Sequence, residues 1–129
     1  MVLFVEAACE TLLVRLVTTI WNFRRYASYL GRSRVETGID EPDPQERIRI
    51  MQIKTAISRC RHLPWARKCL VDSIAAKRMM DRRRIPSTIY LGVAKNNHRL
   101  VAHAWIRSGN IWVSGGRERG RYTVVGFFS

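Results

Sequence analysis

The chain has 129 residues, enough for one compact domain with its own hydrophobic core and too few for two. Hydrophobic residues make up 47% of the sequence, which excludes an extensively disordered chain. The formal net charge of +13 favours an anionic partner, but the basic residues are dispersed along the chain, which weighs against a nucleic-acid groove.

The three cysteines indicate a reduced protein without a structural metal. Cys9, Cys60 and Cys69 are an odd number and form no CxxC pair, so we expect neither a disulfide framework nor a zinc site. Glu6 and Glu10 interrupt the first apolar stretch, and no basic segment precedes it. The sequence therefore predicts no signal peptide and a cytoplasmic location.

The first 30 residues predict one long helix, from about Val2 to Leu30. Its polar residues fall on a narrow stripe and apolar residues fill the rest of its surface. Glu6, Glu10 and Arg15 argue against a transmembrane span. We expect a helix that packs on the core, with an amphipathic membrane anchor as the alternative.

A second helix is predicted after a connecting loop over residues 32–44. Asp43 is a suitable N-cap, Pro44 suits the first turn, and Glu46 completes a capping box. The face expected to enter the core carries Ile48, Met51, Ile53, Ile57 and Cys60.

A third helix follows a break at residues 62–65 and is predicted to end near Arg84. Its expected core residues are Leu70, Ile74, Ala75, Met79 and Met80. The arginine run at residues 82–84 is expected to be solvated. Asp72 and Asp81 are expected at the surface as partners of arginines.

The pattern then changes from helical to strand-like. Turns are predicted at Asn96–Asn97 and Gly109–Asn110. The predicted strands cover residues 88–93, 99–106, 111–113 and 122–125. Helices followed by an antiparallel meander predict an α+β fold.

Cys69 and His103 are the residues with the clearest chemical potential. Cys69 lies near the start of the third helix, where the helix dipole lowers the pKa of a thiol. His103 lies in an apolar strand and shares a face with Trp105. Such a pair can form a thiolate and an imidazolium. By spacing alone, two core residues are the competing interpretation.

Several short segments together resemble the lasso-peptide leader peptidases, small bacterial cysteine proteases with a transglutaminase-like, papain-related fold. The resemblance runs from about Trp21 to the C-terminus. The segments are Phe23-Arg24-Arg25 with Leu30-Gly31-Arg32, Leu63-Pro64-Trp65 with Arg67, Cys69 and Leu70, then Arg82-Arg83-Arg84-Ile85-Pro86, Leu91-Gly92-Val93 and Ala102-His103-Ala104-Trp105.

The resemblance implies a protease that removes the leader from a ribosomally synthesised lasso-peptide precursor before ring closure. Cys69 would be its nucleophile and His103 its general base, with no metal or organic cofactor. Residues 63–129 would form the protease core, and residues 1–62 a helical region packed on it. The implied partners are the precursor peptide, a separate leader-recognition protein and an ATP-dependent lasso cyclase.

The sequence departs from this family at the third catalytic position. The resemblance implies an aspartate about a dozen residues after His103, but residues 111–116 contain no acid. Ser114 and Glu118 are the two replacements available nearby. Trp65 and Trp105 are the candidates for lining a substrate groove.

Two other functions stay open. The missing aspartate is compatible with a catalytically impaired scaffold subunit of the maturation complex. The positive charge is compatible with a basic nucleic-acid-binding domain. Trp105 and Trp112 lie in apolar strands rather than among basic residues, so we expect no nucleic acid as partner.

Overall fold

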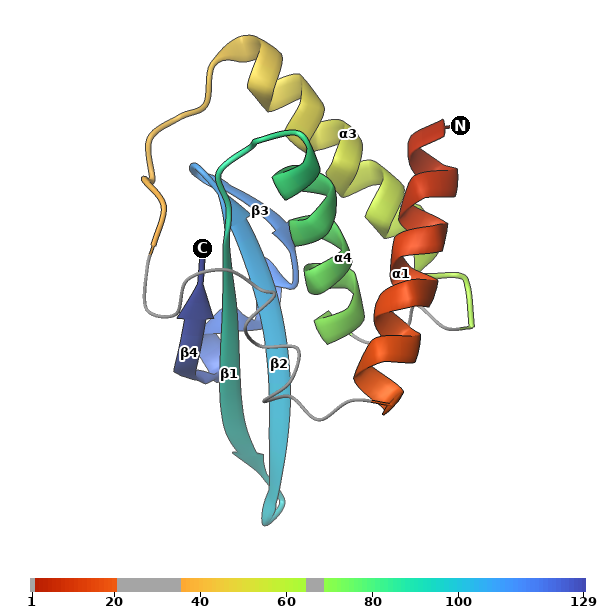
Figure 1. Cartoon of the computed structure of the whole chain (residues 1–129). Coiled ribbons are helices and arrows are strands. Elements are labelled where there is room, and N and C mark those ends of the chain that lie inside the picture. Colours follow the sequence, from red (N-terminus) through yellow and green to blue (C-terminus); the bar gives the residue numbers. More distant parts are fainter. Residues whose placement is uncertain (1, 21–35, 65–68) are drawn as a thin grey trace.

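The computed structural model describes residues 2–20, 36–64 and 69–129, and in this part helices pack on one face of an antiparallel sheet (Figure 1). The helices are α1 (Val2–Ile20), α3 (Pro44–Cys60) and α4 (Cys69–Arg82), with a 3₁₀ helix η2 (Gly116–Arg121). The strands are β1 (Thr88–Asn96), β2 (Arg99–Ser108), β3 (Ile111–Ser114) and β4 (Thr123–Phe128). The predicted α+β class is confirmed, and residues 21–35 of the predicted first helix and loop lie outside the described residues.

The sheet has the strand order β3-β2-β1-β4, so the predicted meander is wrong for its last strand. After β3, η2 intervenes and β4 pairs with β1 at the opposite edge, where Phe128 lies beside Ile89. This pairing places Phe128 in the hydrophobic core. The β1–β2 turn is Asn97–His98, one residue later than predicted. Both residues have positive φ, as a two-residue hairpin turn requires.

Helix α3 begins as its sequence predicts. The Asp43 carboxylate accepts a hydrogen bond from the Glu46 N–H at 2.8 Å, and Pro44 occupies the first turn. The predicted core face is wrong for its first two residues: Ile48 and Met51 are exposed, and Ile50 is buried instead. Positions 50, 53, 57 and 60 repeat by three or four and together face α4 and β3, which leaves Ile48 and Met51 on the outer side. The prediction that Cys60 is a core residue is confirmed.

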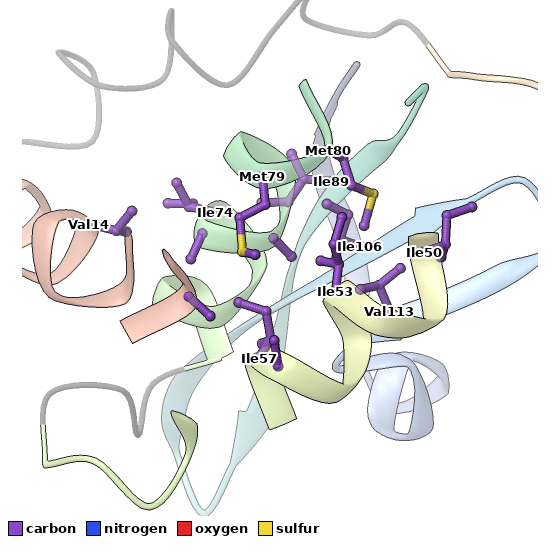
Figure 2. Close-up of a cluster of buried hydrophobic side chains, with 14 of the residues drawn as sticks. Val14, Ile50, Ile53, Ile57, Ile74, Met79, Met80, Ile89, Ile106 and Val113 are labelled. Atoms are coloured by element: carbon purple, nitrogen blue, oxygen red, sulfur yellow. The ribbon is translucent and has the colours of Figure 1, made fainter. Parts of the chain in front are cut away.

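The main hydrophobic core lies between α3, α4 and the helix-facing side of the sheet (Figure 2). Met79 and Met80 of α4 meet Ile89 of β1 and Ile106 of β2, and all four are fully buried. Val14 of α1 reaches the same cluster from the outside. The burial predicted for Ile74, Ala75, Met79 and Met80 is confirmed.

Helix α1 is held on α4 by ion pairs that the sequence analysis did not predict. Arg82 and Arg83 both bind the Glu6 carboxylate, at 2.7 and 2.5 Å. Arg78 binds Glu10 at 2.6 Å, and Arg82 also contacts Glu10. The Arg83 hydrogen bond lowers the pKa of Glu6 against the opposing effect of burial. Arg82 and Arg84 are exposed, as expected for a solvated run, whereas Arg83 is partly buried because it lies against the Glu6 carboxylate of α1.

No helix within the described ranges combines the length and the apolar character that a bilayer span requires.

Candidate functional site

Strand β2 presents different chemistry on its two faces. Ala104 and Ile106 face the helices, and Ile106 belongs to the main core. Because successive side chains of a strand alternate, His103 and Trp105 lie on the opposite face. There Trp105 is buried and stacks on Tyr90, with ring centroids 5.9 Å apart.

His103 is fixed within this aromatic face. Its ring stacks on Trp105 at a centroid distance of 5.8 Å and on Tyr122 at 4.9 Å. Its Nε2 lies 2.9 Å from the backbone oxygen of Gly115. A carbonyl oxygen only accepts hydrogen bonds, so Nε2 carries the proton in the neutral ring and Nδ1 is the basic nitrogen.

Gly115 has a backbone conformation suited to glycine. Its φ is +70°, in the left-handed region, and it stands at the N-terminus of η2. A Cβ at this position would lie 2.4 Å from the backbone oxygen of Ala104 and 3.1 Å from His103 Nε2. The glycine thus allows the chain to approach β2 closely enough for its carbonyl to reach the imidazole.

A cavity of about 900 Å³ lies next to His103. It is bounded by the C-terminal half of α3, the first turns of α4, β3 and the start of η2. The polar and charged residues of its lining include Lys54, Arg61, Asp72, His103, Ser114 and Arg117. His103 of β2 and Asp72 of α4, the helix that begins at Cys69, therefore line the same cavity.

Asp72 contributes a buried carboxyl group to this cavity. Its side chain is 4% exposed, and Oδ2 lies 3.4 Å from Arg61 Nε. Oδ1 has no hydrogen-bond partner among the residues that the structure describes. Burial raises the pKa of Asp72 to about 7, and Arg61 opposes this shift.

The expected surface position of Asp72 is therefore wrong, because the beginning of α4 is enclosed by α3 and β3. Its position three residues after Cys69, on the same side of a helix, is the sequence signal that could have assigned it to the site. Asp81 is half-exposed as predicted, but it pairs with Lys77 at 2.9 Å rather than with an arginine.

The other predicted site residues differ in how far the structure describes them. Cys69 is the first residue of α4, but its side chain and that of Glu118 lie outside the described part, as does all of Trp65. The pairing of Cys69 with His103 thus stays a prediction. Ser114 is buried and its Oγ has no hydrogen-bond partner among the described residues, since His103 binds Gly115 instead.

The described part also offers no ready metal centre. No three His, Cys, Asp or Glu side chains within residues 2–20, 36–64 and 69–129 are grouped closely enough to hold an ion.

His103 and Asp72, in the first turn of the helix that Cys69 begins, line the same cavity, and a cysteine and a histidine at one cavity are suited to acyl-transfer chemistry. Residues 12–126 match the family model of the transglutaminase-like superfamily, and the chain belongs to that superfamily. The match includes the C-terminal part of α1 and all of α3, α4 and β1 to β3. This membership is compatible with cysteine protease activity. No curated protein and no solved structure gave a significant match.

Proposed function

We propose that this protein is a cysteine peptidase that removes the leader peptide from a ribosomally synthesised lasso-peptide precursor. The observation that carries the peptidase chemistry is the bond between His103 Nε2 and the Gly115 carbonyl, which leaves Nδ1 as the basic nitrogen of a histidine that lines the cavity. The leader substrate rests on the resemblance of the short segments around Cys69 and His103.

In the proposed reaction, Cys69 is the nucleophile. His103 Nδ1 accepts the thiol proton, and the sulfur attacks the carbonyl carbon at the junction of leader and core. The imidazolium then gives its proton to the leaving amine, and a thioester remains on Cys69. Water hydrolyses the thioester, again with His103 as base. The backbone N–H groups of the first turn of α4, which have no partner within a helix, are suited to stabilise the oxyanion.

The Gly115 carbonyl takes the orienting role that the resemblance assigns to an aspartate. It fixes the tautomer and the ring plane of His103 through one hydrogen bond. As a neutral group it adds less stabilisation to the imidazolium than a carboxylate would. We therefore expect a functional but weakly activated pair, with Ser114 and Glu118 not required.

The partners follow from the same resemblance. A distinct leader-recognition protein would present the precursor. An ATP-dependent lasso cyclase would then use the released core peptide. All of these steps belong in the cytoplasm.

The test measures the alkylation rate of each cysteine against pH by mass spectrometry. We expect Cys69 to react rapidly below pH 7, and its rate to fall by about tenfold or more in His103→Ala. His98→Ala is the matched control, because His98 is an exposed histidine at the hairpin turn. Cys9, which is exposed, and Cys60, which is buried, are internal references.

An ordinary Cys69 titration near pH 8.5, unchanged in His103→Ala, would contradict the proposed pair. Cleavage of a precursor, in the presence of the leader-recognition protein, then tests the substrate separately. A reactive Cys69 without precursor cleavage would retain the peptidase chemistry and reject the leader substrate.

The absence of an acid in residues 111–116 favours one second candidate, a scaffold subunit without catalysis. It predicts stable association with the recognition protein and cyclase and an unreactive Cys69. A nucleic-acid-binding sheet is disfavoured, because Trp105 is 3% exposed and so offers almost no surface for a base to stack on.

A further inference from the structure

Helix α1 has a second apolar face that points away from the core. The residues on this face repeat at intervals of three and four along the helix. They are Val2, Val5, Cys9, Leu12 and Leu16, with Leu13 beside them, and all six are exposed. Ala7 and Val14, on the other side of α1, are buried against the rest of the protein. Packing inside the molecule thus does not explain the apolar residues on the outer face of α1.

Helix α3 continues this surface. A shallow groove of about 530 Å³ separates the first turn of α1 from Ile48 and Met51, and both of these side chains are exposed. We call Val2, Val5, Leu12, Leu13, Leu16, Ile48 and Met51 the outer apolar surface. Contiguous apolar residues on the outside of a domain mark an interaction site more often than isolated ones do.

Positive charge borders the outer apolar surface. Arg47 and Arg59 line the groove, and both are exposed. Arg59 forms no ion pair within the part of the chain that the structure describes. The acidic residues of α1, Glu6 and Glu10, are already neutralised by arginines of α4. With a net charge of +13 for the whole chain, the matching partner is anionic.

The position of α1 suits a broad, deformable partner. α1 packs on α3 and α4, on the side of the helical layer away from the sheet, so it forms an outer ridge (Figure 1). A partner helix needs a groove that encloses it, whereas a lipid surface adapts to a ridge.

We propose that α1 and α3 dock this protein on an anionic membrane surface. The outer apolar surface enters the boundary between headgroups and acyl chains, and Arg47 and Arg59 contact acidic headgroups. The helix lies on the membrane and does not cross it. This inference is independent of the proposed peptidase function.

The test is co-sedimentation of the full chain with vesicles of phosphatidylcholine, with and without phosphatidylserine. We expect binding at least about tenfold stronger to the phosphatidylserine vesicles, and weaker as salt is added. Leu12→Ser with Leu16→Ser should reduce that binding by about tenfold or more. The matched control is Val124→Ser with Val125→Ser, which changes two exposed apolar residues of β4 and should leave binding unchanged.

Two further measurements separate charge from apolar insertion. Arg59→Gln should weaken binding about fivefold, whereas Arg99→Gln, at the exposed end of the β1–β2 hairpin, should not. An environment-sensitive fluorophore on Cys9, in a Cys69→Ser chain, should shift its emission to the blue when phosphatidylserine vesicles are added. Circular dichroism and a thermal melt establish that each variant is folded.

Three outcomes would overturn the proposal. Equal binding of the Leu12/Leu16 variant and the unmodified chain would mean that charge alone attracts the vesicles. No binding to phosphatidylserine vesicles would exclude the membrane. A dimer in analytical ultracentrifugation that strengthens with salt, disappears in the Leu12/Leu16 variant and leaves vesicles unbound would assign the outer apolar surface to a second copy of the chain.

Discussion

The two faces of the sheet are built in different ways. The helix-facing side carries aliphatic residues such as Ile89 and Ile106, which are fully buried beneath α3 and α4. The opposite side carries Tyr90, His103 and Trp105, joined by ring stacking. The first face stabilises the fold through apolar burial, whereas the second holds polar groups in fixed positions. A histidine needs the second kind of environment to keep one tautomer and one orientation.

A buried arginine completes the aromatic face. Arg107 donates to the Tyr90 hydroxyl at 2.9 Å, and to the backbone oxygens of Thr37, Gly38 and Gly109. These bonds attach the segment before α3 to the sheet. Hydrogen bonds therefore hold the chain segment that contacts the aromatic face, whereas aliphatic packing holds the helices on the other side of the sheet.

The largest expected effect is on the helix-facing side. Ile106→Ala should lower the free energy of unfolding by about 3 kcal/mol, because it leaves a cavity in the main core. Urea unfolding measures this loss, and Val125→Ala, at an exposed site on β4, should change stability by less than about 0.5 kcal/mol. A loss for Ile106→Ala as small as that of the control would mean that this side is not the main source of stability.

A second effect concerns the buried carboxyl group of Asp72 in the cavity next to His103. The pKa of Asp72 is raised from 3.8 to about 7, so the native state favours the protonated carboxyl. The protonated carboxyl group of Asp72 makes its full contribution to the free energy of unfolding below pH 4. That contribution is lost as the pH rises through 7. Asp72→Asn should remove this dependence and stabilise the protein by about 2 kcal/mol at pH 8 relative to the unmodified chain. Urea unfolding at pH 5 and pH 8 measures the difference.

Asp81→Asn is the control for that experiment, since Asp81 is half-exposed on the same helix. Parallel pH profiles for the Asp72→Asn variant and the unmodified chain would contradict the buried, proton-binding state of Asp72.

The smallest expected effect on stability is on the aromatic face, at Gly115. Gly115→Ala places a Cβ against the Ala104 carbonyl in a left-handed conformation, which should cost about 1–2 kcal/mol. It also moves the carbonyl that orients His103, so the alkylation rate of Cys69 should fall with it. Gly120→Ala, where a Cβ meets nothing within 4 Å, should change neither quantity. Unchanged Cys69 reactivity in Gly115→Ala would mean that the Gly115 carbonyl has no orienting role in the proposed site.

Features that depend on neighbours along the chain could be predicted from the amino-acid sequence alone. The start of α3 at Asp43 and Pro44, the existence of the strands and the burial of Cys60 were all predictable. Caps and turns involve residues only a few positions apart, and hydrophobic periodicity distinguishes a helix from a strand. His103 was identified in the same way, from its place in an apolar strand and from the family resemblance.

Only the tertiary structure decided which partners these elements meet. Nothing local places β4 beside β1, brings Glu6 to Arg83, or buries Asp72 at the cavity. The same applies to the Gly115 carbonyl, because a backbone oxygen has no signal in the sequence. Each of these contacts joins segments far apart along the chain, or depends on which side of a helix its neighbours cover. Local periodicity gives the direction of a side chain, but packing decides what that side chain touches.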